Sequence, residues 1–205
     1  AVDGFSTMLN IVFLGTGGLS VLMALNYLRQ HNIERGEFYP LLLFSVIGMM
    51  TMAMAKDLIV VFLAMELMSI PLYVLSGFAR ARSSSEESAL KYFLLGAFSS
   101  AFLVYGIALV YGATQATGFA EVRAAISNGG EANSFLLPGV GMILVGLGFK
   151  VAAVPFHMWA PDVYEGAPSV VTAFMSVGAK AGGFAALVRV LFDAFGMLAL
   201  DWAPP

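Results

Sequence analysis

Continuous apolar runs fill most of this sequence, and each is long enough to cross the roughly 30 Å hydrocarbon core of a bilayer. The composition agrees, because 60% of the 205 residues are hydrophobic and only 11% are charged. Strands of a membrane β-barrel would instead alternate polar and apolar residues. We therefore expect an all-α, polytopic transmembrane bundle with six spans, over about residues 5–28, 38–55, 58–79, 90–112, 136–155 and 170–192.

Three charged side chains lie near the middle of these apolar runs: Glu66, Lys150 and Lys180. A charge at the bilayer centre costs roughly 2.5 to 3.5 kcal/mol, so three facing lipid would cost on the order of 8 to 10 kcal/mol. Such residues normally face the bundle interior and take part in moving ions or protons. The three residues are therefore our candidates for proton transfer.

Two prolines lie just after two of these charges. Pro71 has no N–H for the carbonyl of Leu67, and Pro155 has none for the carbonyl of Val151. Because lipid offers no partner, protein or water must satisfy both carbonyls. We expect a discontinuous helix, broken near Pro155, whose freed carbonyl favours a cation at Lys150. The alternative is a simple proline kink, with Lys150 snorkelling to the surface.

Small residues surround Lys180 in the stretch SVGAKAGGFAAL. They allow helices to approach closely and leave the lysine facing protein or internal water. The alternative is a lysine held by one structural carboxylate. Burial disfavours a charged lysine and a nearby carboxylate favours it, so a lysine between these effects exchanges its proton when its partner moves. This relay needs no metal or organic cofactor, and we expect neither to bind this chain.

Two further residues are weaker candidates for the relay. His157 follows the expected break, and imidazole changes its charge near neutral pH, which suits transfer between Lys150 and water. A histidine bonded to loop carbonyls is an equal alternative. Lys91 begins the fourth span, where anchoring at the lipid headgroups is the simpler interpretation and a relay the weaker one.

The polar connectors predict the topology. We expect a short amphipathic helix in FAEVRAAIS, ended by SNGG. Alternating connectors put most positive charge on one side, with Arg29, Arg35, Arg80 and Arg82 there and Lys56 and Arg123 on the other. The positive-inside rule then places the loop RARSSSEES in the cytoplasm.

Composition also excludes some functions. The net charge of −3 offers nothing to nucleic acid. With no cysteine, the chain cannot hold a cysteine-ligated iron–sulfur cluster. The sequence begins at Ala1, directly before an apolar run, and ends in APP after a span, so we interpret it as a piece of a longer polypeptide.

Three stretches resemble the antiporter-like membrane subunits of respiratory complex I, the NADH–quinone oxidoreductase. They are GLGFKVAAVPFHMWAPDVYEGAPSVVTAFMSVGAK, KYFLLGAFSSAFLVYGIALVYGAT and AMELMSIPLYVL, and the resemblance covers nearly the whole chain. The last two are most similar to the N type of bacterial subunit. The paralogous L and M types and related cation/proton antiporter subunits are the alternatives.

The resemblance implies a subunit of about fourteen spans with two inverted five-helix repeats. Residues 1–205 would be one transmembrane domain holding the third to eighth spans, and 38–192 would be the first half-channel repeat. By matching motif, Glu66 would be the channel glutamate, Lys150 its lysine partner and Lys180 the central lysine, with His157 on the connecting polar axis. The lysine of the second half-channel would lie beyond the sequence.

The resemblance further implies a multi-pass protein of the bacterial inner membrane, with paralogous antiporter-like subunits and other membrane subunits as partners. NADH, FMN, iron–sulfur clusters and quinone would belong to other subunits, so this chain would serve a translocase without redox catalysis of its own. Two other functions stay open. One is a subunit of a sodium/proton antiporter of the same superfamily, since a carboxylate and freed carbonyls can hold a hard cation. The other is a structural subunit whose buried charges only fix helix packing.

Overall fold

The computed structural model describes residues 2–128 and 134–198, and this part of the chain confirms the all-α class. In chain order the α-helices are α1 (Gly4–Gln30), α2 (Phe38–Met54), α3 (Leu58–Ser76), α4 (Ser83–Thr114), α5 (Phe119–Ser127), α6 (Leu136–Val151), α7 (Trp159–Gly166), α8 (Ser169–Phe174) and α9 (Lys180–Arg189). A π-helical turn, Met175–Ala179, joins α8 to α9, and a second, Val190–Ala194, extends α9. A short 3-10 turn, Gly196–Leu198, follows.

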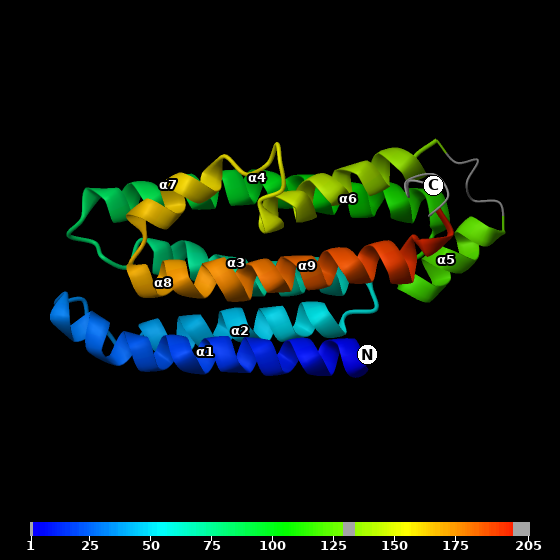
Figure 1. Ribbon diagram of the computed structural model, residues 1–205. Helices are drawn as coiled ribbons and strands as arrows, with labels where there is room; N and C mark the ends of the chain where they lie inside the picture. Colours follow the sequence, from blue (N-terminus) through cyan, green and yellow to red (C-terminus); the bar gives the residue numbers. More distant parts are fainter. Residues whose placement is uncertain (1, 129–133, 199–205) are drawn as a thin grey trace.

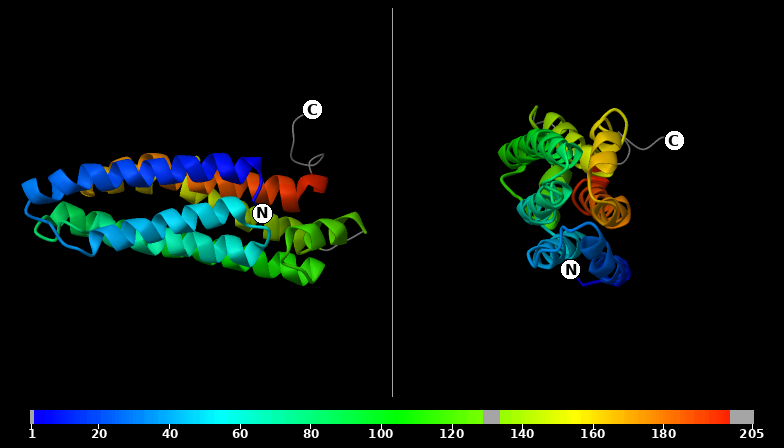
Figure 2. Two further views of the ribbon diagram at one scale, coloured as in Figure 1. Left: turned by 90° about the horizontal axis from the view of Figure 1, so that it is seen from below. Right: turned by 90° about the vertical axis from the view of Figure 1, so that its left-hand side faces the viewer.

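The long helices lie along one axis, and the chain reverses its direction between successive long helices (Figure 1). Helices α1 and α2 form one side of the bundle, α4, α6 and α7 form the opposite side, and α3 and α8–α9 lie between them (Figure 2). The connectors 31–37 and 77–82 lie at one end, and the connectors 55–57 and 115–118 lie at the other. The alternation expected from the sequence is therefore present.

All six expected spans form apolar helices. Four segments are long and apolar enough to cross a membrane: Gly4–Gln30, Leu58–Ser76, Ser83–Thr114 and Ser169–Ala194. Helices α2 and α6 are shorter, with 17 and 16 residues. At 1.5 Å per residue they measure only about 24 to 26 Å. Helix α6 is short because it ends at Val151 instead of continuing to residue 155, and α7 continues the run after a break.

The serines of RARSSSEES belong to a helix, although the sequence suggested a loop. Helix α4 begins at Ser83, well before the expected start at residue 90. The Ser85 hydroxyl donates to the Ser76 carbonyl at the end of α3, 2.7 Å away. Glu86 lies in the first turn of α4, where the helix dipole favours negative charge. This hydrogen bond to α3 and the favourable dipole interaction stabilise a helix start that composition alone does not indicate.

Helix α5 confirms the amphipathic helix expected in FAEVRAAIS. It buries Phe119, Val122 and Ile126 on one face. Its N–H at Phe119 bonds the carbonyl of Lys56 in the connector before α3, at 2.8 Å. Part of its expected stop, Gly129 and Gly130, lies outside the described residues.

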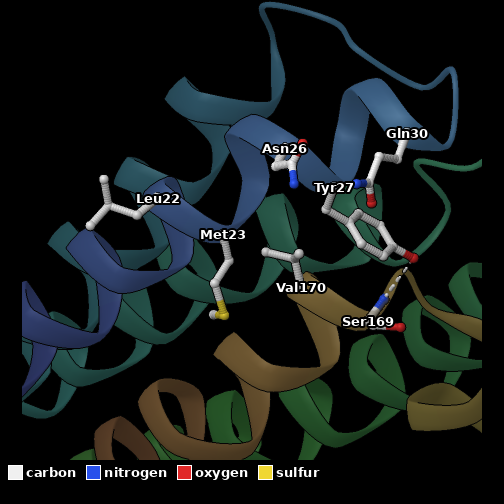
Figure 3. Close-up of a pocket in the computed structure, with 7 residues that line it drawn as sticks. All are labelled: Leu22, Met23, Asn26, Tyr27, Gln30, Ser169 and Val170. Carbon is white, nitrogen blue, oxygen red and sulfur yellow. Dashed lines mark hydrogen bonds between the residues drawn. The ribbon is translucent and has the colours of Figure 1, made fainter.

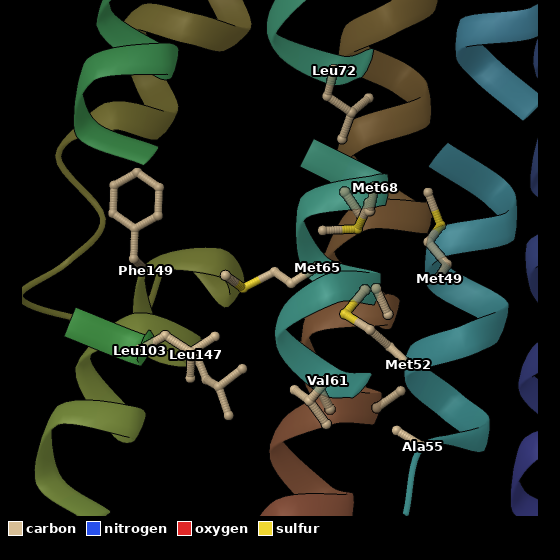
Figure 4. Close-up of a cluster of buried hydrophobic side chains, with 14 of the residues drawn as sticks. Met49, Met52, Ala55, Val61, Met65, Met68, Leu72, Leu103, Leu147 and Phe149 are labelled. Atoms are coloured by element: carbon tan, nitrogen blue, oxygen red, sulfur yellow. The ribbon is translucent and has the colours of Figure 1, made fainter. Parts of the chain in front are cut away.

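Methionine side chains fill the centre of the bundle. Met49 and Met52 of α2 and Met65 and Met68 of α3 are fully buried, and Met65 extends toward Phe149 at the end of α6 (Figure 4). Unbranched thioether chains adapt to irregular gaps between helices. These residues pack α2 against α3, and Met65 reaches the end of α6 that carries Lys150.

Helix α1 has a local cap at its start and a hydrogen bond to the bundle near its far end. Asp3 and Ser6 form a capping box, in which each side chain accepts the backbone N–H of the other, at 2.8 and 2.9 Å. At the far end, the Tyr27 hydroxyl accepts the N–H of Ser169 in the first turn of α8, at 3.2 Å, beside a pocket of about 390 Å³ (Figure 3). This bond satisfies an N–H that the helix start leaves without a partner.

Candidate functional site

The helix break lies between α6 and α7, about halfway along the bundle (Figure 1). Helix α6 ends at Val151, where Ala152 takes a left-handed conformation with φ 55° and bonds the Phe149 carbonyl through its N–H at 3.0 Å. Helix α7 begins again at Trp159. Because Pro155 has no N–H, the Val151 carbonyl is available to another donor. The discontinuous helix expected near Pro155 is confirmed.

The last turn of α6 buries Lys150, of which only 3% is exposed. Its Nζ donates to the hydroxyl of Tyr73 on α3, at 3.2 Å. The same Nζ lies 5.2 Å and 5.5 Å from the ring centroids of Tyr73 and Tyr92, within the range of cation–π attraction. The snorkelling alternative is therefore wrong, because the ammonium group ends inside the bundle among aromatic rings.

Glu66 lies half-buried on α3, two turns before Tyr73. Its Oε1 accepts a hydrogen bond of 2.5 Å from the hydroxyl of Ser100 on α4. Although Glu66 and Lys150 lie on neighbouring helices of the same core, they form no ion pair within 4.0 Å. Each charge is instead bonded to a neutral hydroxyl.

Lys180 directly follows the π-helical turn Met175–Ala179. Turns of this kind are rare and frequent at functional sites. Its Nζ donates to the carbonyl of Val151 at 3.2 Å. The carbonyl freed by Pro155 thus bonds Lys180, whereas the sequence led us to assign it to Lys150. Among the described residues no carboxylate lies within 4.0 Å of the Lys180 ammonium group.

Two glycines of α9 allow this helix to pack closely against α6 and α2. A Cβ on Gly183 would lie 3.0 Å from a methyl of Val151 and 3.3 Å from the Cβ of Lys150. On the adjacent face, a Cβ on Gly182 would lie 3.1 Å from Met49 of α2. This agrees with the close packing expected around Lys180.

The stacked rings of Tyr92 and Trp159 lie between the ammonium groups of the two lysines. The Trp159 ring stacks on Tyr92 with centroids 4.8 Å apart, and its Nε1–H donates to the Phe149 carbonyl at 3.0 Å. The same ring lies 5.5 Å from the Nζ of Lys180. Trp159 therefore contacts the surroundings of both lysines and also satisfies a carbonyl in the last turn of α6.

The structure does not bring His157 or Lys91 to this group. His157 is exposed in the segment between α6 and α7. Lys91 forms ion pairs of 2.6 Å with Glu87 of its own helix and with Asp162 of α7. Lys91 thus links α4 to α7 at a partly exposed position.

The last span also contains a buried cation, Arg189, that was not among the residues expected from the sequence. Arg189 is only 8% exposed, and its guanidinium binds both carboxylate oxygens of Asp3, at 2.5 and 2.6 Å. It also bonds Asp193 and the Ala53 carbonyl, each at 3.0 Å. The sequence did carry a signal for this residue, because Arg189 is a charge inside the expected span 170–192.

Sequence reasoning also missed Tyr73 and Ser100. A tyrosine or serine in an apolar span is unremarkable by composition. The available signal was spacing, since residues i and i+7 share one helix face and Tyr73 follows Glu66 by that interval. Among the described residues, no three His, Asp or Glu side chains come together to hold a metal ion. The group of one carboxylate, two ammonium groups and two hydroxyls suits the holding and transfer of protons.

The sequence matches, over residues 55–203, the model of a family described as NADH:quinone oxidoreductase/Mrp antiporter, TM. The chain belongs to this family. The matched range contains Glu66, Lys150 and Lys180. Membership of the NADH:quinone oxidoreductase/Mrp antiporter family agrees with the resemblance seen in the sequence.

Curated and solved members of the family cover nearly all of the chain. A protein of Trichlorobacter lovleyi named NADH-quinone oxidoreductase subunit N is 51% identical over 203 residues, which is 98% of this chain and 42% of that protein. A chain of respiratory complex I from Thermus thermophilus with bound aureothin is 39% identical with a TM-score of 0.78, covering 98% of this chain and 43% of its own. A chain of the Mrp complex from a Dietzia species is 25% identical with a TM-score of 0.74, covering 92% and 35%. The chain therefore spans about two fifths of the length of the curated relatives that it matches.

Proposed function

We propose that this chain is part of the antiporter-like subunit N of an NADH–quinone oxidoreductase and that it moves protons through Glu66, Lys150 and Lys180. The observation that carries the proposal is the burial of Lys150 with a phenol as its hydrogen-bond partner. A buried ammonium paired with a carboxylate would leave an unpaired charge on losing its proton, at a cost of several kcal/mol. An ammonium bonded to a neutral group can lose its proton without that penalty.

In the proposed sequence of roles, Glu66 modulates the charge of Lys150, Lys150 takes up a proton at the helix break, and Lys180 hands it on. Redox chemistry with NADH, FMN, iron–sulfur clusters and quinone takes place in other subunits and drives these steps through conformational change. The chain corresponds to the third to eighth spans, with the first half-channel repeat over 38–192. Other membrane subunits, including paralogous ones, are its partners in the bacterial inner membrane. The end that carries Arg80 and Arg82 faces the cytoplasm.

The test is NADH-driven proton uptake by membrane vesicles that contain the assembled enzyme with Glu66→Ala or Lys150→Met. Removing a proton-transfer group should slow proton uptake by roughly 10²-fold. Lys56→Met, which removes an exposed lysine from a connector, is the matched control and should leave uptake unchanged. Oxidation of NADH by an artificial electron acceptor should persist in all variants, because it needs only other subunits. Wild-type rate and stoichiometry of pumping in both site variants would refute the proposal.

The second candidate is a subunit of a sodium/proton antiporter of the same superfamily. The likeness to the Mrp complex and the description of the family favour it. The two functions differ in their dependence on sodium. Proton transport that continues in sodium-free vesicles at an unchanged rate excludes the antiporter, whereas transport that requires sodium favours it over complex I.

A further inference from the structure

The hydroxyl bonded to Lys150 occupies a space that is shaped for it. Tyr73 is only 6% exposed, and its hydroxyl lies against Gly96 of α4, where a Cβ would overlap it. The Tyr92 ring packs edge-on against the Tyr73 ring, with centroids 4.7 Å apart. Two positions of α4 therefore hold the Tyr73 phenol in place. Gly96 has no side chain and leaves room for the hydroxyl, and Tyr92, one turn earlier, packs against the ring.

The hydroxyl bonded to Glu66 lies on the same seam between α3 and α4. Ser100 follows Gly96 by one turn of α4, and Glu66 precedes Tyr73 by two turns of α3. Seven residues of helix measure about 10 Å, so Glu66 and Tyr73 lie at different heights on one face of α3. Because the two helices are antiparallel, the glycine meets the tyrosine and the serine meets the glutamate.

A phenol can serve a lysine in both of its charge states. The Tyr73 oxygen accepts a hydrogen bond from an ammonium group, and its O–H can donate to a neutral amine. An ionised carboxylate carries a full negative charge, so it would favour the charged lysine over the neutral amine. Ser100 meanwhile donates to an oxygen of Glu66, so the carboxyl group has a hydroxyl partner of its own on α4.

We propose that Tyr73 and Ser100 are positioning residues that keep Lys150 and Glu66 on separate hydroxyl partners, so that Lys150 changes its protonation state without losing its hydrogen bond. When Lys150 loses its proton, the Tyr73 O–H donates to the neutral amine, whereas its oxygen accepts from the charged ammonium group. Tyr73 keeps its own proton in both states, so its O–H bond is not broken. This inference rests on the proposed role of Lys150 in proton transfer and adds two residues to it.

The experiment measures NADH-driven proton uptake, as a function of pH, by the assembled enzyme with Tyr73→Phe or Ser100→Ala. Loss of a hydrogen bond to a charged group should lower the rate about tenfold and shift the pH profile of uptake. Gly96→Ala should reproduce Tyr73→Phe, because the new methyl group displaces the hydroxyl. Ser100→Thr keeps a hydroxyl and should restore most of the rate.

Two matched variants separate this role from packing. Ser99→Ala removes the neighbouring hydroxyl, which bonds the Gly146 carbonyl instead, and Tyr105→Phe removes an exposed phenol of α4. Both should keep the wild-type pH profile. In addition, Ser100→Ala should have no further effect in a Glu66→Gln background, since the charge that it serves is gone.

The outcomes distinguish the two proposals. Wild-type rate and pH profile in both Tyr73→Phe and Ser100→Ala, with Glu66→Ala still inactive, overturn the positioning role and leave the proposed function intact. Normal pumping in Glu66→Ala and Lys150→Met removes the proposed function and this inference with it. Equal losses in Ser99→Ala and Ser100→Ala would assign the serine a packing role and overturn its part of the proposal.

Discussion

The two buried cations of this chain have opposite surroundings. Arg189 binds the carboxylates of Asp3 and Asp193 and the carbonyl of Ala53. Lys150 is more deeply buried, yet among the described residues it bonds only the hydroxyl of Tyr73 and otherwise faces aromatic rings. Both groups avoid lipid, so burial alone does not distinguish them.

Under the proposed function, the difference separates a structural charge, Arg189, from an exchangeable one, Lys150. Guanidinium stays protonated in proteins, and two carboxylates hold Arg189. The pair with Asp3 also joins the last span to the start of the first. A lysine loses its proton far more readily when it is desolvated. A partner that tolerates both charge states is therefore suited to Lys150, and carboxylates in contact would oppose its change of charge.

The sharpest way to break this comparison is Lys150→Arg, which keeps the positive charge but prevents its loss. We expect NADH-driven proton uptake per assembled complex to fall by roughly 10²-fold, as for the removal of any proton-transfer group. Arg189→Lys, a change of the same kind at the structural site, serves as the control and should leave uptake per complex unchanged. Wild-type uptake in Lys150→Arg would show that Lys150 does not need to release a proton.

The second prediction concerns stability at the structural site. Arg189→Met leaves Asp3 and Asp193 without their cation and should destabilise the folded protein by about 1–3 kcal/mol, the range for hydrogen bonds to charged groups. We choose this range because both carboxylates are partly exposed, 39% and 42% at their side chains, and water replaces much of the lost interaction. Thermal unfolding in detergent measures the effect. A loss of pumping per assembled complex without a change in stability would contradict the structural role.

A smaller effect is expected at Trp159, which lies between the surroundings of Lys150 and those of Lys180. Trp159→Phe keeps a ring beside Lys180 but removes the hydrogen bond from Nε1 to the Phe149 carbonyl. The loss should be about 0.5–1.5 kcal/mol in unfolding free energy, typical of one neutral hydrogen bond. Unfolding of the purified assembly checks this value. No measurable change would mean that water replaces the indole at the end of α6.

The smallest predicted effect is a pH dependence of stability that appears only in acid. The hydrogen bonds from Arg189, followed by the bond from the Ser6 N–H, hold the pKa of Asp3 well below its usual range. The stabilisation is therefore complete above the unfolded pKa of about 4 and is lost as the pH falls below it. Asp3→Asn should be less stable than the wild type at neutral pH, and the two unfolding midpoints should converge in acid. A constant difference down to low pH would contradict this linkage.

Apolar runs, isolated charges and prolines were sufficient to predict the bundle, the helix break, the burial of Lys150 and the partial burial of Lys180. They act through costs that are nearly independent of context, namely a charge in lipid and a proline without an N–H. The same reasoning assigned the freed carbonyl to Lys150, because distance along the chain was the only guide. The π-helical turn before Lys180, which the sequence does not signal, accompanies the actual contact with Val151.

The partners of the charges could not be predicted, because they depend on which helices are neighbours. Arg189 and Asp3 are separated by 186 residues and meet only because the last span packs near the first. Tyr73 and Ser100 carry no charge, so no cost in lipid marks them out. The early start of α4 at Ser83 likewise depends on a tertiary hydrogen bond from Ser85 to the end of α3.

Helix α7 is a short helix that connects the surroundings of Lys150 with those of Lys180. Its first residue, Trp159, lies against Tyr92 on the side of Lys150 and over the ammonium group of Lys180 on the other. The helix break leaves α7 free of the continuous hydrogen-bond ladder that would tie it rigidly to α6. A small tilt of these eight residues would therefore change the packing around both lysines at once, by contact between rings and without any charge passing from one site to the other.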